Sequence, residues 1–226
     1  MVEVVEMDSL DEHAFFPRGN DTNVLVPSGL KELLDNDTFR WVSCDIPRSK
    51  NTQILKTTWT YKQKCDRKKA RMCARGDLQR KCDIGETYAP VVRPESQRIL
   101  LALATRLKWQ VTALDIRNAY VTARLPKTVY CHPPPGYERP GVCLEVDKAL
   151  YGLGASGRLF YKHFTRQIRS IGFKPSPADP CVYVHRTNKV ILTSHVDDCM
   201  IMGEPEYAEA ARKAIARLYT VRDNGL

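Results

Sequence analysis

Residues 189–203 read KVILTSHVDDCMIMG, and this stretch decides the fold class of the chain. Apolar or small residues occupy both of its halves, and only Asp197 and Asp198 interrupt them near the centre. The chain can reverse direction only at these aspartates, so the stretch predicts a β-hairpin with two adjacent carboxylates at its tip. A hairpin set among helical segments favours an α+β fold over a doubly wound parallel sheet.

The periodicity of apolar residues predicts the remaining elements of this α+β fold. Strands are expected at residues 110–116, 181–185, 190–196 and 199–202. Four further segments have apolar residues at three- and four-residue spacing, typical of helices that face a core. These helices are expected at residues 28–34, 96–107, 156–171 and 206–219. Ser156 is expected to cap the third helix and Gly172 to end it, and Pro205 to open the fourth.

Charge is unevenly distributed along the 226 residues, which carry +9 overall. Residues 62–81 hold nine basic and two acidic side chains, and the strand-like alternation before them predicts a basic hairpin. Its turn is expected at residues 66–69, and its return strand at 70–78 would carry Arg71 and Arg75 on one side. Nucleic acid is the first candidate partner, while a solvated basic surface explains the charge equally well.

The rest of the composition indicates a soluble intracellular protein. Eight cysteines occur singly, without Cys-x-x-Cys pairs or histidines at zinc-finger spacing, so reduced and mostly buried thiols are expected. The acidic N-terminus is unlike a signal peptide, and no segment has the roughly 18 apolar residues of a membrane span. Residues 1–40 hold nine acids against three bases and are predicted to be an acidic leader, partly disordered.

Three carboxylates form the candidate site. Asp115 ends the strand-like segment QVTALD, and Asp197 and Asp198 lie at the predicted hairpin tip. Taken singly, Asp115 suits a cap and the pair suits a plain turn. Together they are better explained by a two-metal site, in which two ions about 4 Å apart clamp the attacking and leaving oxygens of a phosphoryl displacement. The basic hairpin would then contact a triphosphate and a nucleic-acid backbone.

Six ordered motifs resemble the reverse transcriptase of copia-type LTR retrotransposons, over about seven eighths of the chain. The resemblance lies in KKARMCARGDLQ, ETYAPVVR, LDIRNAYVTARLPKTVYCHPPPGY, KALYGLGASGRLFY, IGFKPSPADPCVYV and SHVDDCMIMG. It implies an α+β fingers and palm region with a ferredoxin-like antiparallel palm sheet backed by helices. The implied division is fingers at residues 53–107 and palm at 108–226, within a reverse transcriptase domain at 41–226 that ends before the thumb.

The resemblance also implies a role for each matching residue. The aspartates Asp115, Asp197 and Asp198 match the three catalytic carboxylates, which bind two Mg²⁺ (or Mn²⁺) ions. Tyr120 matches the aromatic gate that excludes a ribose 2′-hydroxyl. The other matches are to residues near the nucleotide, namely Lys69, Arg71, Arg75, Tyr151 and Gly152.

The implied function is RNA-directed DNA synthesis from dNTPs on a primed RNA or DNA template. The alternative is a catalytically inactive remnant, or a domesticated protein that keeps only nucleic-acid binding. Other parts of a retroelement polyprotein are expected partners, and a cytoplasmic virus-like particle or the nucleus is the expected location. His195, Gly154 and Gly157 depart from the family pattern, and the two glycines predict a more flexible loop.

Overall fold

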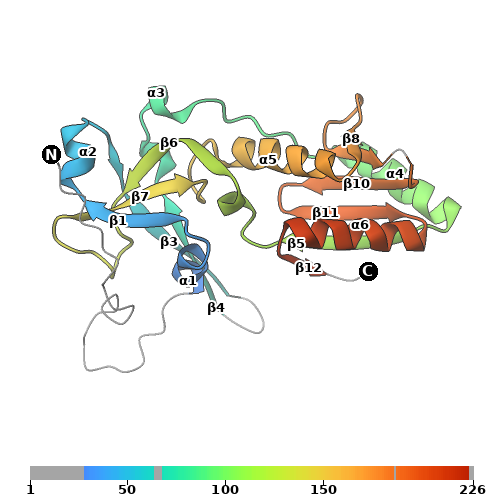
Figure 1. Cartoon of the computed structure of the whole chain (residues 1–226), viewed down its shortest axis with the longest axis horizontal. Helices are drawn as coiled ribbons and strands as arrows, with labels where there is room; N and C mark the ends of the chain where they lie inside the picture. Colours follow the sequence, from blue (N-terminus) through green and yellow to red (C-terminus); the bar gives the residue numbers. More distant parts are fainter. Residues whose placement is uncertain (1–27, 64–67, 186, 224–226) are drawn as a thin grey trace.

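The computed structural model describes residues 28–63, 68–185 and 187–223, and Figure 1 traces them as an α+β fold with mostly antiparallel pairing. Most of the predicted leader, all of it before residue 28, lies outside the described residues. Its end does not, because residues 28–34 form the predicted helix α1 (Ser28–Leu34) and the following strand β1 begins at Phe39. The predicted α+β class is confirmed.

The larger sheet has the strand order β12-β5-β11-β10-β9-β8, and its paired neighbours are antiparallel throughout. Its strands are β5 (Gln110–Ile116), β8 (Phe173–Pro175), β9 (Val182–His185), β10 (Val190–His195), β11 (Asp198–Gly203) and β12 (Val221–Asp223). The predicted hairpin is confirmed as β10 and β11. The short edge strands β8 and β12 were missed, since three residues are too few to show a period.

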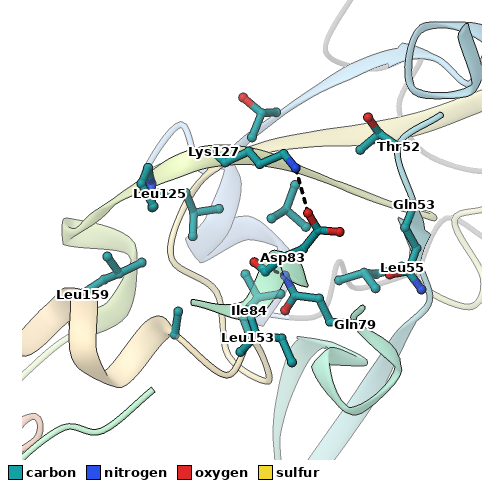
Figure 2. Close-up of a pocket in the computed structure, with 14 residues that line it drawn as sticks. Thr52, Gln53, Leu55, Gln79, Asp83, Ile84, Leu125, Lys127, Leu153 and Leu159 are labelled. Atoms are coloured by element: carbon teal, nitrogen blue, oxygen red, sulfur yellow. Dashed lines mark hydrogen bonds and ion pairs between the residues drawn. The ribbon is translucent and has the colours of Figure 1, made fainter. Parts of the chain in front are cut away.

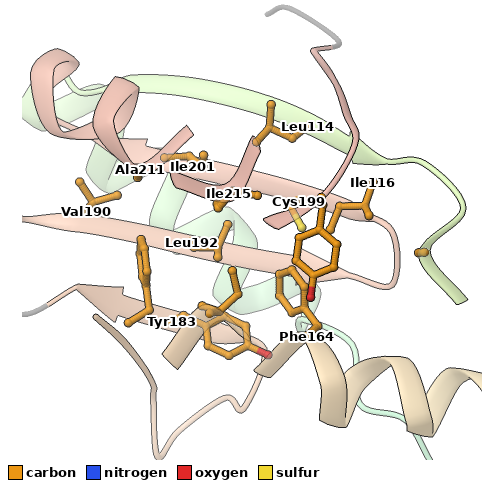
Figure 3. Packing of buried hydrophobic residues seen from close by; sticks show 14 of the residues in the cluster. Leu114, Ile116, Phe164, Tyr183, Val190, Leu192, Cys199, Ile201, Ala211 and Ile215 are labelled. Atoms are coloured by element: carbon orange, nitrogen blue, oxygen red, sulfur yellow. The ribbon is translucent and has the colours of Figure 1, made fainter. Parts of the chain in front are cut away.

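Two helices cover one face of this sheet and bury its core (Figure 3). Helix α5 (Ser156–Ser170) contributes Phe164, and helix α6 (Pro205–Leu218) contributes Ile215. They pack on the alternate residues of the central strands, such as Leu192 and Ile201, which are fully buried. Burial of this apolar face is what drives the sheet and helices together, at about 25 cal/mol for each Å² removed from water.

Helix α4 (Pro94–Leu107) lies on the opposite face, where its predicted apolar stripe is only partly buried. Ile99 is 67% exposed and Leu107 47% exposed, whereas Ala104 is fully buried. The prediction that the whole stripe is core was therefore wrong. The helix contacts the sheet through other positions, including Gln97, whose amide nitrogen lies 2.9 Å from the sulfur of Met200 in β11.

A second sheet has the order β1-β7-β6-β2, with β2 and β6 parallel and the other pairs antiparallel. Its strands are β1 (Phe39–Ser43), β2 (Ile54–Leu55), β6 (Arg124–Cys131) and β7 (Val142–Lys148). Strands β1 and β7 were not predicted, and residues 124–148 were assigned to the predicted palm region at 108–226. Because β7 pairs with β1 and β6 pairs with β2, this sheet combines residues 124–148 with strands that precede residue 56.

The predicted basic hairpin is present as β3 (Thr57–Gln63) and β4 (Lys68–Ala74). Most of its predicted turn, at residues 64–67, lies outside the described residues. The return strand was predicted to reach residue 78 but ends at Ala74, and the 3₁₀ turn η2 (Gly76–Leu78) follows. The strand ends there because the chain docks on another segment, with the Ala74 amide donating to the Tyr151 carbonyl at 2.8 Å.

Three short elements complete the described structure: α2 (Asp45–Ser49), α3 (Lys81–Ile84) and η3 (Ala119–Thr122). The predicted cap of α5 was wrong. Ser156 is the first residue of the helix, and its buried hydroxyl donates to the Leu150 carbonyl at 2.6 Å. Gly172 does follow the end of α5 with φ +97°, and Pro205 does open α6. No helix in the described ranges combines the length and apolarity needed to cross a membrane.

The seven cysteines that the structure describes are all free thiols. Five of them are buried, Cys73 is partly buried, and Cys82 is exposed. The prediction of reduced, mostly buried thiols is confirmed for these residues, whereas Cys65 lies outside the described part of the chain.

Close backbone contact fixes how the hairpin base meets the segment at residues 150–153. A Cβ atom on Gly76 would lie 2.1 Å from the carbonyl oxygen of Gly152. We expect Gly76→Ala to lower the free energy of unfolding by about 1 to 3 kcal/mol, as for other overpacked sites. Urea denaturation measures this, with Gly157→Ala as the control, because a Cβ there would make only an ordinary 3.4 Å contact. Equal stability of the two variants would contradict the prediction.

Candidate functional site

The register between β5 and β11 brings two of the candidate carboxylates together. Asp115 and Asp198 are directly opposite one another in this antiparallel pair. Directly opposed residues project from the same face of a sheet, with Cβ atoms about 4.5 to 5.5 Å apart. Their neighbours Leu114 and Cys199 are buried on the face covered by α5 and α6. The two carboxylates therefore lie on the other face, at the end of the sheet where β5 finishes.

The third carboxylate lies in the tight turn between β10 and β11. His195 and Asp198 pair across the hairpin, so its tip consists of Val196 and Asp197. The predicted tip at Asp197 and Asp198 was wrong by one residue, because Asp198 already belongs to β11. The Asp197 carbonyl accepts a 2.9 Å hydrogen bond from the Ile116 amide, which ties the turn to the end of β5. Val196 has φ +58°, a conformation that is strained for a β-branched residue and that often occurs at functional sites.

Repulsion among the three carboxylates is evident from the pKa of Asp197. Partial burial is the largest cause that raises this pKa, and the negative charges of Asp198 and Asp115 raise it further. The guanidinium of Arg71 acts in the opposite direction. The turn is therefore a place where negative charge accumulates and where a cation would be stabilised.

The donor set suits a hard divalent cation that also binds substrate. Mg²⁺ prefers one or two protein carboxylates together with waters and phosphate oxygens, and the opposed carboxylates of Asp115 and Asp198 meet this need. Within the described ranges, no group of three or more Asp, Glu, His or Cys side chains is arranged to hold a metal ion. The protein thus offers an open set of oxygen ligands and no closed cage.

Aromatic and basic side chains lie beside the carboxylates. The Arg71 guanidinium lies 5.1 Å from the centre of the Tyr151 ring, in a cation–π contact. The Tyr151 and Tyr120 rings meet edge to face with centroids 4.7 Å apart. Burial raises the pKa of Tyr151 to about 12, although Arg71 opposes the shift. Tyr151 therefore contacts both Arg71 and Tyr120, and all three residues were predicted to lie near the nucleotide.

The three remaining residues predicted to lie near the nucleotide, Gly152, Arg75 and Lys69, have different surroundings. Gly152 has φ +92°, and a Cβ there would lie 2.0 Å from the Ala74 carbonyl oxygen, so glycine is required next to Tyr151. Arg75 lies beyond the end of β4, and its guanidinium makes two hydrogen bonds, of 2.8 and 2.7 Å, to the Asp77 carboxylate. Lys69 lies within β4 opposite Lys62. Arg75 therefore lies outside the strand that carries Arg71, whereas the prediction had placed both on the same side of one strand.

Comparison with known proteins assigns the family. A family model described as reverse transcriptase (RNA-dependent DNA polymerase) matches residues 36–225. The chain belongs to this family. The resemblance predicted from the six motifs is thereby confirmed, and the opposed carboxylates lie at positions that those motifs cover.

Relatives of this reverse transcriptase family member are retrotransposon polyproteins. It is 32% identical over 97% of its length to the Pol polyprotein from transposon TNT 1-94 of Nicotiana tabacum. It is 31% identical over 79% of its length to that from transposon RE1 of Arabidopsis thaliana. A yeast relative, the Ty1-ER2 Gag-Pol polyprotein of Saccharomyces cerevisiae, is 28% identical over 67% of the chain. The chain spans 17%, 13% and 9% of these three proteins, respectively.

The departures from the family pattern leave the carboxylates in place. His195 is exposed and stands opposite Asp198, so this departure does not open the core. Gly157 lies inside the first turn of α5, and a Cβ on Gly154 would approach Ile84 to 3.2 Å. The predicted flexible loop is therefore shorter than expected, and its flexibility stays a prediction.

A hollow open to solvent lies elsewhere on this reverse transcriptase family member (Figure 2). Leucines such as Leu55 and Leu153 line it, and an ion pair of 2.7 Å joins Lys127 and Asp83 beside them. None of the three aspartates lines this hollow. The hollow is therefore separate from the candidate site, in which Asp115 and Asp197 are partly buried and Asp198 is exposed.

The raised pKa of Asp197 predicts that its charge destabilises the folded state. A carboxyl group whose pKa is higher when folded favours folding at low pH, and this advantage is lost as pH rises from the unfolded value, near 3.9, through the folded value. Asp197→Asn should therefore raise the melting temperature at pH 7 and change it little at pH 3. Thermal denaturation at both pH values measures this, with exposed Asp35→Asn as the control. An unchanged or lower melting temperature at pH 7 would contradict it.

Proposed function

We propose that this chain carries a template-directed DNA polymerase site that adds dNTPs to a primer on an RNA or DNA template. The observation that supports this most directly is the pairing of Asp115 with Asp198, with Asp197 in the adjoining turn. The motifs match these three residues to the family's catalytic carboxylates. Their convergence from separate strands is what a two-metal nucleotidyl transfer needs.

The sheet topology supports assigning the larger sheet as the palm. Strands β5, β10, β11 and β12 lie in the spatial order β12-β5-β11-β10, with α5 between β5 and β10 and α6 between β11 and β12 in sequence. This is the arrangement of a ferredoxin-like unit. The β3–β4 hairpin and the sheet β1-β7-β6-β2 would form the fingers. The proposed fingers thus include residues 124–148, in addition to the segment at 53–107.

Each candidate residue has a defined task in this proposal. Divalent cations held by Asp115, Asp197 and Asp198 would lower the pKa of the primer 3′-hydroxyl and neutralise charge on the departing pyrophosphate. Arg71 supplies positive charge to the nucleotide phosphates from the hairpin side. The paired rings of Tyr120 and Tyr151 form the wall against which the sugar packs. Other segments of a polyprotein would also bind the primer–template duplex.

Primer extension tests the proposal. Purified chain at high concentration, with a primed RNA template and either Mg²⁺ or Mn²⁺, should incorporate dNTPs. Asp198→Asn should lower the rate at least about 100-fold, because it removes a charged metal ligand. Asp35→Asn is the matched control and should retain activity, because that side chain is exposed near α1. Template binding without incorporation under either metal would favour the non-catalytic alternative and overturn the proposal.

The sugar specificity of the site gives a separate prediction. Tyr120 is partly buried between Tyr151 and Phe160, so its ring is held in place by two neighbours. Tyr120→Val should reduce the preference for dNTPs over rNTPs by about 10- to 200-fold, the range available to a steric pocket. Single-nucleotide kcat/KM values for dCTP and CTP measure it. Unchanged discrimination would show that Tyr120 does not contact the sugar.

A further inference from the structure

Strand β12 brings an arginine to the edge of the carboxylate site. It pairs antiparallel with β5, so that Arg222 lies directly opposite Asp115. A hydrogen bond of 2.9 Å from the Arg117 amide to the Thr220 carbonyl holds the start of the strand in this register. Val221, the preceding residue, packs on the helix-covered core. Since successive strand residues alternate faces, Arg222 projects from the same face as Asp115.

Arg222, Asp115 and Asp198 therefore occupy successive positions in one row across β12, β5 and β11. Neighbours in such a row have Cβ atoms about 5 Å apart, which is well within the reach of an arginine side chain. Arg222 is exposed, and it makes no hydrogen bond or ion pair within the part of the chain that the structure describes. Its guanidinium is free to meet a ligand beside the carboxylates.

We propose that Arg222 binds a phosphate group of the substrate at this end of the sheet. The carboxylates attract cations but repel phosphate, so a polyanionic substrate needs positive charge close to them. A guanidinium offers two parallel N–H donors that match phosphate oxygens. Arg71 reaches Asp197 from the hairpin, whereas Arg222 stands beside Asp115 on the sheet edge. The two arginines would thus contact the substrate from different sides.

This inference rests on the proposed polymerase function and leaves two sources for the phosphate. One is the triphosphate of the incoming nucleotide, and the other is the backbone of the primer–template. Arg222→Gln removes the charge and the donors, and Arg222→Lys keeps the charge alone. Arg217→Gln is the matched control, because Arg217 is an exposed arginine of α6 on the opposite face.

The measurements are kcat and KM for dNTP in primer extension, Kd for dNTP by equilibrium dialysis, and Kd for primer–template by fluorescence anisotropy. We expect Arg222→Gln to raise either KM and Kd for dNTP or Kd for primer–template about 10-fold or more, with kcat changed less than about 3-fold. Raised dNTP constants identify the nucleotide as the source. A raised primer–template Kd, with a salt slope smaller by about one, identifies the backbone. Arg222→Lys should recover part of the loss.

Two results would overturn the inference. In the first, the constants of Arg222→Gln for dNTP and for primer–template both stay within about 2-fold of those of Arg217→Gln. In the second, Arg222→Gln lowers kcat and the melting temperature without a change in binding, which would make Arg222 a structural partner of Asp115. If the unmodified chain synthesises DNA in either case, the proposed function stands. If it synthesises none, the proposed function fails, and the two Kd measurements still decide the role of Arg222.

Discussion

The antiparallel register of β5 against β11 is the constraint on which the candidate site depends. Leu114 and Cys199 are paired and buried under α5 and α6, and this burial selects the register. A slip of one residue would expose the core and turn the polar residues inward. Because side chains alternate along a strand, the register that buries Leu114 also places Asp115 beside Asp198. The pairing of β5 with β11 therefore produces the hydrophobic core on one face of the sheet and the carboxylate pair on the other.

A second constraint joins the basic hairpin to this sheet through backbone contact. A Cβ atom on Gly76 would meet the Gly152 carbonyl oxygen, and one on Gly152 would meet the Ala74 carbonyl oxygen, so neither position has room for a Cβ atom. This close packing, with the hydrogen bond from Ala74 to Tyr151, fixes the base of the hairpin next to the segment before α5. The cation–π contact of Arg71 with Tyr151 follows from it. The positive side of the site is thus positioned by this glycine packing together with a second hydrophobic cluster, in which Met72 and Ala74 of the hairpin are buried with Leu150 and Leu153.

The site keeps features that oppose folding. The charges of Asp115 and Asp198 repel the carboxylate of Asp197 in a partly buried turn, and the strained φ of Val196 is held by the strands on either side. Such costs persist in proteins where the surrounding structure overdetermines them and where function uses them. Here the excess negative charge would be compensated by cations. The same logic explains why arginines, which neutralise both acids and phosphates, border the site on two sides.

The sequence by itself determined the hairpin of β10 and β11, the bounds of β5, and most of α4, α5 and α6. Each of these has a period that burial of one face imposes, and the motifs named Asp115, Asp197 and Asp198 as candidates. Sequence reasoning missed β1, β7, β8 and β12, and it overestimated the burial of Ile99 and Leu107 on α4. These depend on partners far away in the chain. Only the tertiary structure decided that Asp115 faces Asp198 and that Arg222 joins the row. Strand register and backbone docking are set by contacts between distant segments, which no local pattern contains.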